Sequence, residues 1–174
     1  MRFKEYLKEY YVDPMPDDPS LFGRITSIFK KSTLIKEINH NDLEIKLYLA
    51  KLASNSHSFV FTLEDNILGF VTLQLFENTK YWQVLSANIF RKDLRGRGIM
   101  PMIYLNIVDL GYQMMHGGSL SSDAEKMWKK LITQTKSNTY DSVEDKLLPT
   151  DDKPTKDNVK IHEGSQRYFW LIQK

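Results

Sequence analysis

The chain has 174 residues, of which 41% are hydrophobic and 26% are charged, and its formal net charge is +2. This composition suits one soluble domain and excludes a strong basic field of the kind that holds nucleic acid or anionic membranes. The sequence has no cysteine, which excludes disulfides, thiolate metal sites and cysteine nucleophiles. No apolar run is long enough to span a membrane, so we expect a cytoplasmic protein.

The first part of the chain, residues 1–56, is expected to be helical. Apolar residues at helical spacing predict a short helix over Phe3–Tyr11, and three prolines then interrupt regular structure over Asp13–Pro19. Leu21–Phe29 also fits one face of a helix. A further helix is expected over Leu43–Leu52, with Asn41 or Asp42 as its N-cap.

The middle of the chain changes to a β pattern. Segments His57–Leu63, Ile67–Phe76 and Tyr81–Arg91 are rich in β-branched and aromatic residues. Short polar turns separate them at Glu64–Asn66 and Asn78–Lys80. Links this short join antiparallel neighbours, so a three-stranded meander is predicted.

Helices are expected after the meander. Lys92–Gly98 is polar and contains glycine, and the mostly apolar stretch Ile99–Tyr112 predicts a helix that lies against a sheet. Ala124–Ile132 predicts a shorter amphipathic helix.

The last part of the chain is expected to begin with a long surface loop over Thr133–Asn158, because that segment is polar. Arg167–Ile172 predicts a final strand. The fold class is therefore α/β in the α+β sense, with a mixed, mainly antiparallel central sheet flanked by helices. We expect one domain over residues 1–174, made of an N-terminal substrate-side part (1–56), a meander and binding core (57–132), and a loop with a C-terminal strand (133–174).

The segment Arg95–Gly98 (R-G-R-G) carries the chemistry. Glycines at a strand-to-helix turn let the backbone approach a ligand closely. The N–H groups at a helix start bind anions, and guanidinium groups match phosphate oxygens. The pattern therefore predicts a pyrophosphate site. It lacks the Gly-Lys-Ser/Thr of a P-loop and the three spaced glycines of a dinucleotide fold, but a basic turn that binds nucleic acid stays an alternative.

This motif resembles the coenzyme A motif Arg/Gln-x-x-Gly-x-Gly/Ala of the GNAT (GCN5-related N-acetyltransferase) superfamily, with Arg95–Met100 at its positions. The resemblance covers about residues 57–172, and with S-S-D-A-E-K-M-W-K-K-L over 121–131 it is closest to small bacteriophage proteins. It implies acetyl transfer from acetyl-CoA, or another acyl-CoA, to an amine acceptor, which is a small molecule or a protein. For a phage protein the location would be the host cytoplasm.

The resemblance also implies which residues bind the coenzyme A thioester. A backbone N–H of Ile89 or Phe90 would polarise the thioester carbonyl beside a gap between the family's fourth and fifth strands. The implied cofactor-binding residues are Ile89, Phe90, Arg91, Arg95, Gly96, Arg97, Gly98, Ile99, Met100, Ser121, Ala124 and Trp128.

Two residues depart from the family pattern. Met100 stands where the family has Gly or Ala, and its long side chain is expected to crowd the pyrophosphate. Trp128 stands where the family often has a tyrosine that protonates the departing thiolate, and an indole cannot serve as that acid. A GNAT-like protein that binds without catalysis is therefore the alternative to an enzyme.

Candidate catalytic residues are His116 and Glu77. His116 precedes Gly117 and Gly118, and imidazole titrates near neutral pH, so it is the best acid or base that the sequence offers. Glu77 lies at a hairpin end. The remaining histidines are dispersed, so no metal site is predicted.

Overall fold

The structure, a computed structural model, describes residues 19–118, 120–156, 160–162 and 165–174. The helix predicted over Phe3–Tyr11, and nearly all of the interruption after it, lie outside the described residues. Within them, no helix is long and apolar enough to cross a membrane.

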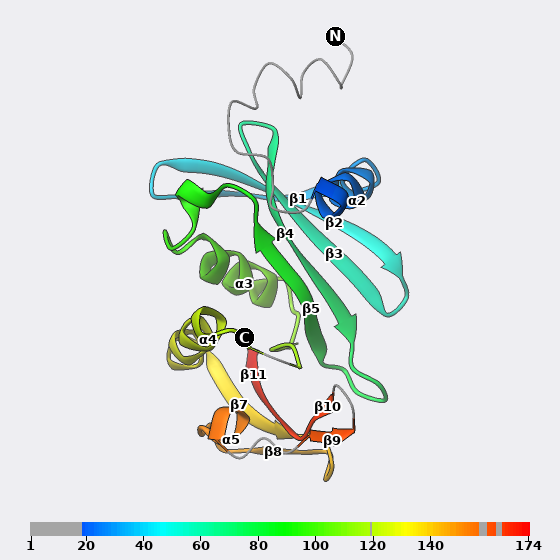
Figure 1. The fold of residues 1–174 in the computed structure, drawn as a ribbon, viewed down its shortest axis with the longest axis vertical. Helices are drawn as coiled ribbons and strands as arrows, with labels where there is room; N and C mark the ends of the chain where they lie inside the picture. Colours follow the sequence, from blue (N-terminus) through cyan, green and yellow to red (C-terminus); the bar gives the residue numbers. More distant parts are fainter. Residues whose placement is uncertain (1–18, 119, 157–159, 163–164) are drawn as a thin grey trace.

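A mixed sheet of nine strands runs through the described residues (Figure 1). Its order is β1-β2-β3-β4-β5-β6-β11-β7-β8, and the β5–β6 pair is parallel while the other pairs are antiparallel. The predicted fold class, a mainly antiparallel sheet with flanking helices, is confirmed. The strands are β1 (Thr33–His40), β2 (Leu43–Ala53), β3 (Ser56–Leu63), β4 (Asn66–Leu75), β5 (Trp82–Ile89), β6 (Met114–Met115), β7 (Lys136–Asp141), β8 (Lys146–Leu148) and β11 (Tyr168–Gln173). Strands β9 (Lys160–His162) and β10 (Ser165–Gln166) form a separate small sheet.

Helices cover both faces of the sheet (Figure 1). Neighbouring residues of a strand point to opposite faces, so Val60 and Phe70 pack under α2 while Phe59 and Val71 belong to the larger core under α3. The same large core includes Trp128 and Leu131 of α4. The helices are α2 (Pro19–Phe29), η1 (Lys92–Leu94, a short 3-10 turn), α3 (Ile99–Asp109), α4 (Ser122–Gln134) and α5 (Lys153–Lys156).

The predicted meander is confirmed and is longer than expected. The segment predicted to be a helix, Leu43–Leu52, is strand β2, which pairs with β1 and β3. Asn41 and Asp42 form the hairpin turn between β1 and β2, with positive φ values of 48° and 61°, and do not cap a helix. Positive φ at both central residues is the geometry of a tight two-residue hairpin turn.

The prediction of a long loop over Thr133–Asn158 is also wrong. This segment completes α4 and then forms β7, β8 and α5. Strand β7 is polar, yet it pairs with β11 along its whole length and buries Thr139 and Asp141. The Asp141 carboxylate is bound by the Arg167 guanidinium at 2.7 Å, so its burial is compensated.

Candidate functional site: a glycine bend and a strand edge

The R-G-R-G segment forms a tight bend at the start of α3. Gly96 and Gly98 have φ values of 77° and 76°, a region that side chains disfavour. Gly98 is the N-cap of α3. The first N–H groups of a helix have no partner inside the helix, so the bend presents backbone donors and the positive end of the helix dipole.

Arg95 fixes the bend to the end of β5. Its Nε donates to the carbonyl oxygen of Ile89 at 2.9 Å, and its terminal nitrogen donates to Asn88 Oδ1 at 3.4 Å. The guanidinium group therefore lies along the strand end and brings positive charge to the mouth of the bend.

A pocket of about 370 Å³ opens beside the bend. The end of β5, the start of α3 and the first turns of α4 form its walls, and apolar side chains make up much of its surface. Its lining residues are Ala87, Asn88, Ile89, Arg95, Gly96, Met100, Tyr104, Ser121, Asp123, Ala124 and Met127.

One wall of the pocket is a strand edge that no other strand among the described residues covers over its last residues. Strand β6 pairs with β5 at Trp82 and Gln83 and no further. Just beyond, β5 carries a bulge: Ser86 is opposite Thr72 and Val84 is opposite Leu73, which leaves Leu85 unopposed. A gap in strand pairing therefore separates the last residues of β5 from the described C-terminal strands (Figure 1).

The hydrogen bonds of β4 determine which groups of β5 face the gap. The Phe90 N–H donates to Leu68 O at 2.9 Å, so Phe90 bonds toward β4. Alternate residues of an antiparallel strand bond to opposite sides, so the N–H and C=O of Ile89 and Ala87 face the gap. The Ile89 carbonyl indeed accepts from Arg95 on that side.

The two residues that were predicted to polarise a carbonyl lie in different surroundings. The Phe90 N–H is used within the sheet, and the Phe90 side chain is buried under α2 on the other face. Phe90 is therefore excluded from the pocket, whereas Ile89 lines it. Arg91 does not line the pocket either, and it forms an ion pair with Asp93 at 2.6 Å.

Several other predicted binding residues come together. Arg95, Gly96, Met100, Ser121 and Ala124 all line the pocket. Ser121 is the N-cap of α4, and its Oγ accepts the Ala124 N–H at 3.2 Å, so its own hydroxyl proton points elsewhere.

Four further predicted binding residues lie outside the pocket lining, namely Arg97, Gly98, Ile99 and Trp128. Arg97 and Ile99 belong to the bend itself, where Arg97 is exposed and Ile99 is buried against the core. Trp128 is 1% exposed and packs in the core against Tyr104, with 5.7 Å between ring centroids. Trp128 therefore lies in the core and not on the pocket surface, where the resemblance had placed it.

His116 is not placed to exchange protons with a substrate. It is fully buried among the rings of Trp128, Phe169 and Trp170. Its Nδ1–H donates to Gly117 O at 2.6 Å, and no partner for Nε2 is found among the described residues. Burial lowers the pKa of His116 from 6.5 to about 4, so the ring is neutral at pH 7.

Glu77 lies far from the pocket along β5. It is exposed in the turn before Trp82, whereas the pocket lies at the Ala87–Ile89 end of the same strand. A strand rises about 3.3 Å per residue, so the two are separated by more than the length of a side chain. The catalytic roles predicted for His116 and Glu77 do not fit this site.

The structure adds pocket residues that the sequence did not point to. Tyr104 comes from the apolar face of α3, and Met127 from α4. Tyr104 is 2% exposed. Burial raises the pKa of this phenol, which keeps it protonated. The carboxylate of Asp123 also lines the pocket.

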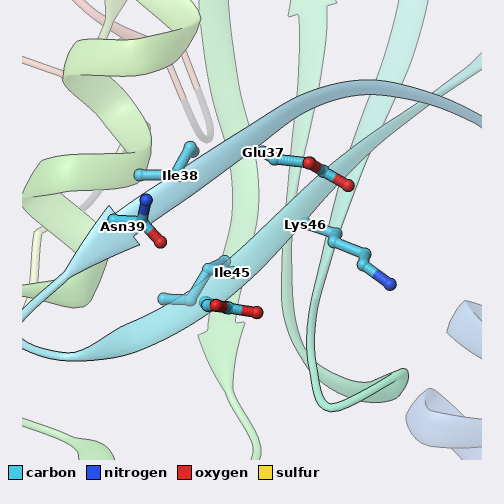
Figure 2. Close-up of a pocket in the computed structure, with 6 residues that line it drawn as sticks. Glu37, Ile38, Asn39, Ile45 and Lys46 are labelled. Atoms are coloured by element: carbon cyan, nitrogen blue, oxygen red, sulfur yellow. The ribbon is translucent and has the colours of Figure 1, made fainter.

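A second pocket, of about 170 Å³, lies on the β1–β2 hairpin (Figure 2). Its side chains do not converge: Ile38 and Ile45 point to one side, while Glu37 and Lys46 point to the other. Lys46 is paired with Asp65 at 2.7 Å. No metal-binding group of His, Cys, Asp or Glu is found in the part of the chain that the structure describes.

No family model matches the sequence, and no curated protein matches it. Among solved structures, the chain is similar to a protein of Bacteroides thetaiotaomicron described as a GNAT-family acetyltransferase, with 11% identity, coverage of 91% of this chain and 85% of that one, and a TM-score of 0.44. It is also similar to the ribosomal-protein-S18-alanine N-acetyltransferase of Escherichia coli, with 10% identity, 91% and 90% coverage, and a TM-score of 0.42.

A third similar structure is nourseothricin acetyltransferase, with 10% identity, coverage of 82% of this chain and 84% of that one, and a TM-score of 0.41.

Proposed function

We propose that this protein is an acyl-CoA-dependent N-acyltransferase that moves an acyl group, in the first place acetyl, to an amine. The observation that carries the proposal is the pocket between the glycine bend and the gap-facing edge of β5. A phosphate site and an amide-binding edge side by side match the two ends of an acyl-coenzyme A.

The fit follows from the chemistry of each wall. Backbone N–H groups at the start of α3 would hold the pyrophosphate, with the charge of Arg95 beside them. The remaining arm of coenzyme A is an extended chain with amide groups. Such a chain can hydrogen bond to the gap-facing N–H groups of Ala87 and Ile89 and to the C=O of Ala87, as an added strand would, while the Ile89 carbonyl is bound by Arg95.

The transfer step needs a polarised carbonyl and a proton for the leaving group. The amine lone pair attacks the thioester carbon while the Ile89 N–H stabilises negative charge on the carbonyl oxygen. The C–S bond breaks, and the sulfur takes a proton from the Tyr104 hydroxyl. The ammonium nitrogen of the tetrahedral intermediate loses its proton to water, so that a neutral amide is released, and water returns a proton to the Tyr104 oxygen. The buried, protonated phenol in the pocket wall supports this role.

Binding is tested by thermal unfolding with and without acetyl-CoA. A ligand at a hundredfold excess over its dissociation constant adds about 2.7 kcal/mol to the free energy of unfolding. Arg95→Ala and Gly98→Glu should abolish the shift. Arg91→Ala is the matched control, because its side chain pairs with Asp93 away from the pocket. If wild type shows no shift, acyl-CoA is not its ligand.

Transfer is tested by thiol release from acetyl-CoA with a panel of primary amines. The chain has no cysteine, so a thiol reagent reports coenzyme A alone. Tyr104→Phe should lower kcat by about 100-fold with little change in KM. Tyr112→Phe is the control, since it loses a hydroxyl bonded to His57 outside the pocket. Equal rates for the two variants would remove Tyr104 from the mechanism.

A second candidate is a GNAT-like binding protein without catalysis. It is favoured by Met100, whose long side chain lines the pocket beside the bend, and by the carboxylate of Asp123, which would repel phosphate. An acetyl-CoA shift with no thiol release across the amine panel would select it. A salt-dependent gel shift on DNA or RNA would instead support the basic-turn alternative. The single domain, the bacteriophage source and the cytoplasmic location stay predictions from the sequence.

A further inference from the structure

A histidine from a distant part of the chain contacts the glycine bend. His40 is the last residue of β1, and its Nε2 lies 3.2 Å from the carbonyl oxygen of Arg97. A Cβ atom built on Gly98 would lie 3.6 Å from the same nitrogen, so the ring packs directly against the bend. The hairpin turn at Asn41–Asp42 and the pairing of His40 with Leu43 fix the backbone that carries the ring.

The contact with Arg97 bears on the neighbouring N–H group. The peptide bond is planar and trans, so the C=O of Arg97 and the N–H of Gly98 point in opposite directions. A hydrogen bond that holds the Arg97 carbonyl toward the hairpin therefore turns the Gly98 N–H away from it. Gly98 has no side chain to hold this peptide, and its positive φ is accessible in several orientations of the turn.

We propose that His40 is a positioning residue for phosphate binding. By donating its Nε2–H to Arg97 O, it holds the Arg97–Gly98 peptide so that the Gly98 N–H faces a phosphate oxygen of the nucleotide. His40 itself does not touch the ligand in this proposal. The inference rests on the proposed function and names a residue from the N-terminal hairpin as part of that site.

The neighbouring Asn41 competes for the same nitrogen. Its amide Nδ2 lies 3.2 Å from His40 Nε2. An amide N–H can donate only to an Nε2 that carries no proton, and such a nitrogen cannot donate to Arg97 O. The two contacts therefore require different tautomers, and the bend is held when the proton is on Nε2. Removing the Asn41 amide should favour the holding tautomer.

The test measures affinity for two probes, acetyl-CoA and S-acetylpantetheine, by competition against labelled coenzyme A. The second probe has the thioester arm but lacks the nucleotide phosphates. His40→Ala should weaken the binding of acetyl-CoA about tenfold. The affinity for S-acetylpantetheine and the melting temperature should stay unchanged. His40→Gln should recover most of the affinity, because a glutamine amide can donate to Arg97 O. Asn41→Gly, which tolerates the positive φ, should bind acetyl-CoA at least as well as wild type.

Two results would overturn the inference. One is a His40→Ala variant that binds acetyl-CoA like wild type, and the other is a variant that loses both probes by the same factor. Neither result touches the proposed function, because wild type still binds acetyl-CoA in both. If wild type binds neither probe, the proposed function fails and this inference fails with it.

Discussion

Single residues in this protein show how far burial changes chemistry. His116 was the best acid or base that the sequence offered, and it lies in a cage of three aromatic rings. A charged imidazole there would lose its hydration, and the hydrogen bond from Nδ1 to Gly117 O offsets only part of that loss. The neutral ring therefore packs in the core, whereas protonation of the ring would destabilise the folded protein.

The pH dependence of stability should report this burial. The folded-state pKa of about 4 lies below the ordinary 6.5, so between these values the unfolded chain binds more protons. Stability should therefore fall as the pH drops from 6.5 to 4, by up to about 3 kcal/mol from this residue. In urea titrations His116→Phe should lose less stability over that range than wild type. Parallel loss in both proteins would show that His116 carries none of the dependence.

Gly69 is a second residue with a measurable role. A Cβ atom there would lie 2.3 Å from the Asn88 carbonyl oxygen and 2.5 Å from a ring carbon of Phe61. Gly69→Ala should therefore destabilise the protein by about 3 kcal/mol in urea unfolding. Gly23→Ala is the control: nothing lies within 4 Å of its Cβ position in α2, so it should stabilise by about 0.5 kcal/mol. A Gly69→Ala variant as stable as wild type would contradict the close packing.

At this scale the sequence predicted the residues of one continuous motif and missed those brought in from elsewhere. Arg95, Gly96 and Gly98 could be found because glycine and arginine have distinctive roles at a helix start. Tyr104 reads as an ordinary core residue of α3, and His40 is 57 positions from its partner Arg97. No pattern in one sequence reports such a contact.

Among the elements, β2 shows why propensity can mislead. Leu43, Ile45, Leu47 and Leu49 alternate along the chain, which is the period of a strand, and Ile45 and Leu47 are fully buried. Leu, Glu, Lys and Ala favour helices, and Asn41–Asp42 resembles an N-cap, so the local composition indicated a helix. Strand pairing on both sides outweighs that preference.

Strand β7 shows the opposite problem. Its sequence, Lys136–Asp141, is too polar to predict a buried strand, yet Thr139 and Asp141 are buried because side chains elsewhere satisfy them. Thr139 donates to Asp151 at 3.0 Å, and Arg167 pairs with Asp141. These partners are 12 and 26 residues away, so the polar segment looked like a loop.

The orientation of β5 leads to a test on this element. Ala87→Pro removes an N–H that faces the gap, and prolines are tolerated at such an edge. It should weaken acetyl-CoA binding while the free energy of unfolding changes little. Asn88→Pro removes an N–H that faces β4, so it should destabilise the sheet. Urea unfolding and ligand titration of both variants check this, and equal destabilisation would mean that the edge is assigned incorrectly.

In the whole molecule, two groups of strands meet at the short β5–β6 pairing, but one core continues across it. The large cluster contains Val84 and Ile103 on one side and Met114, Trp128 and Trp170 on the other. Two residue pairs of β5 and β6 join the two groups of strands through the backbone. The side chains of α3 and α4 therefore provide much of the contact between these groups. A shared core of this kind favours a single cooperative transition.

Unfolding in urea should accordingly be two-state. Trp82, Trp128 and Trp170 report on both sides of the β5–β6 pairing through fluorescence, while circular dichroism reports on the backbone of the whole chain. The two curves should give one midpoint and one slope. A fluorescence transition that precedes the loss of dichroism would show that the C-terminal strands open separately.

The interrupted pairing of β5 also has a consequence for exchange with deuterated water. The amide of Phe90 is bonded into the sheet and should exchange slowly, whereas those of Ala87 and Ile89 face the gap and should exchange fast. An extended molecule that settles against this edge would act as an additional strand. Exchange would then slow at the gap-facing amides and stay unchanged at the amides between them. This alternation would show on which side of β5 the ligand binds.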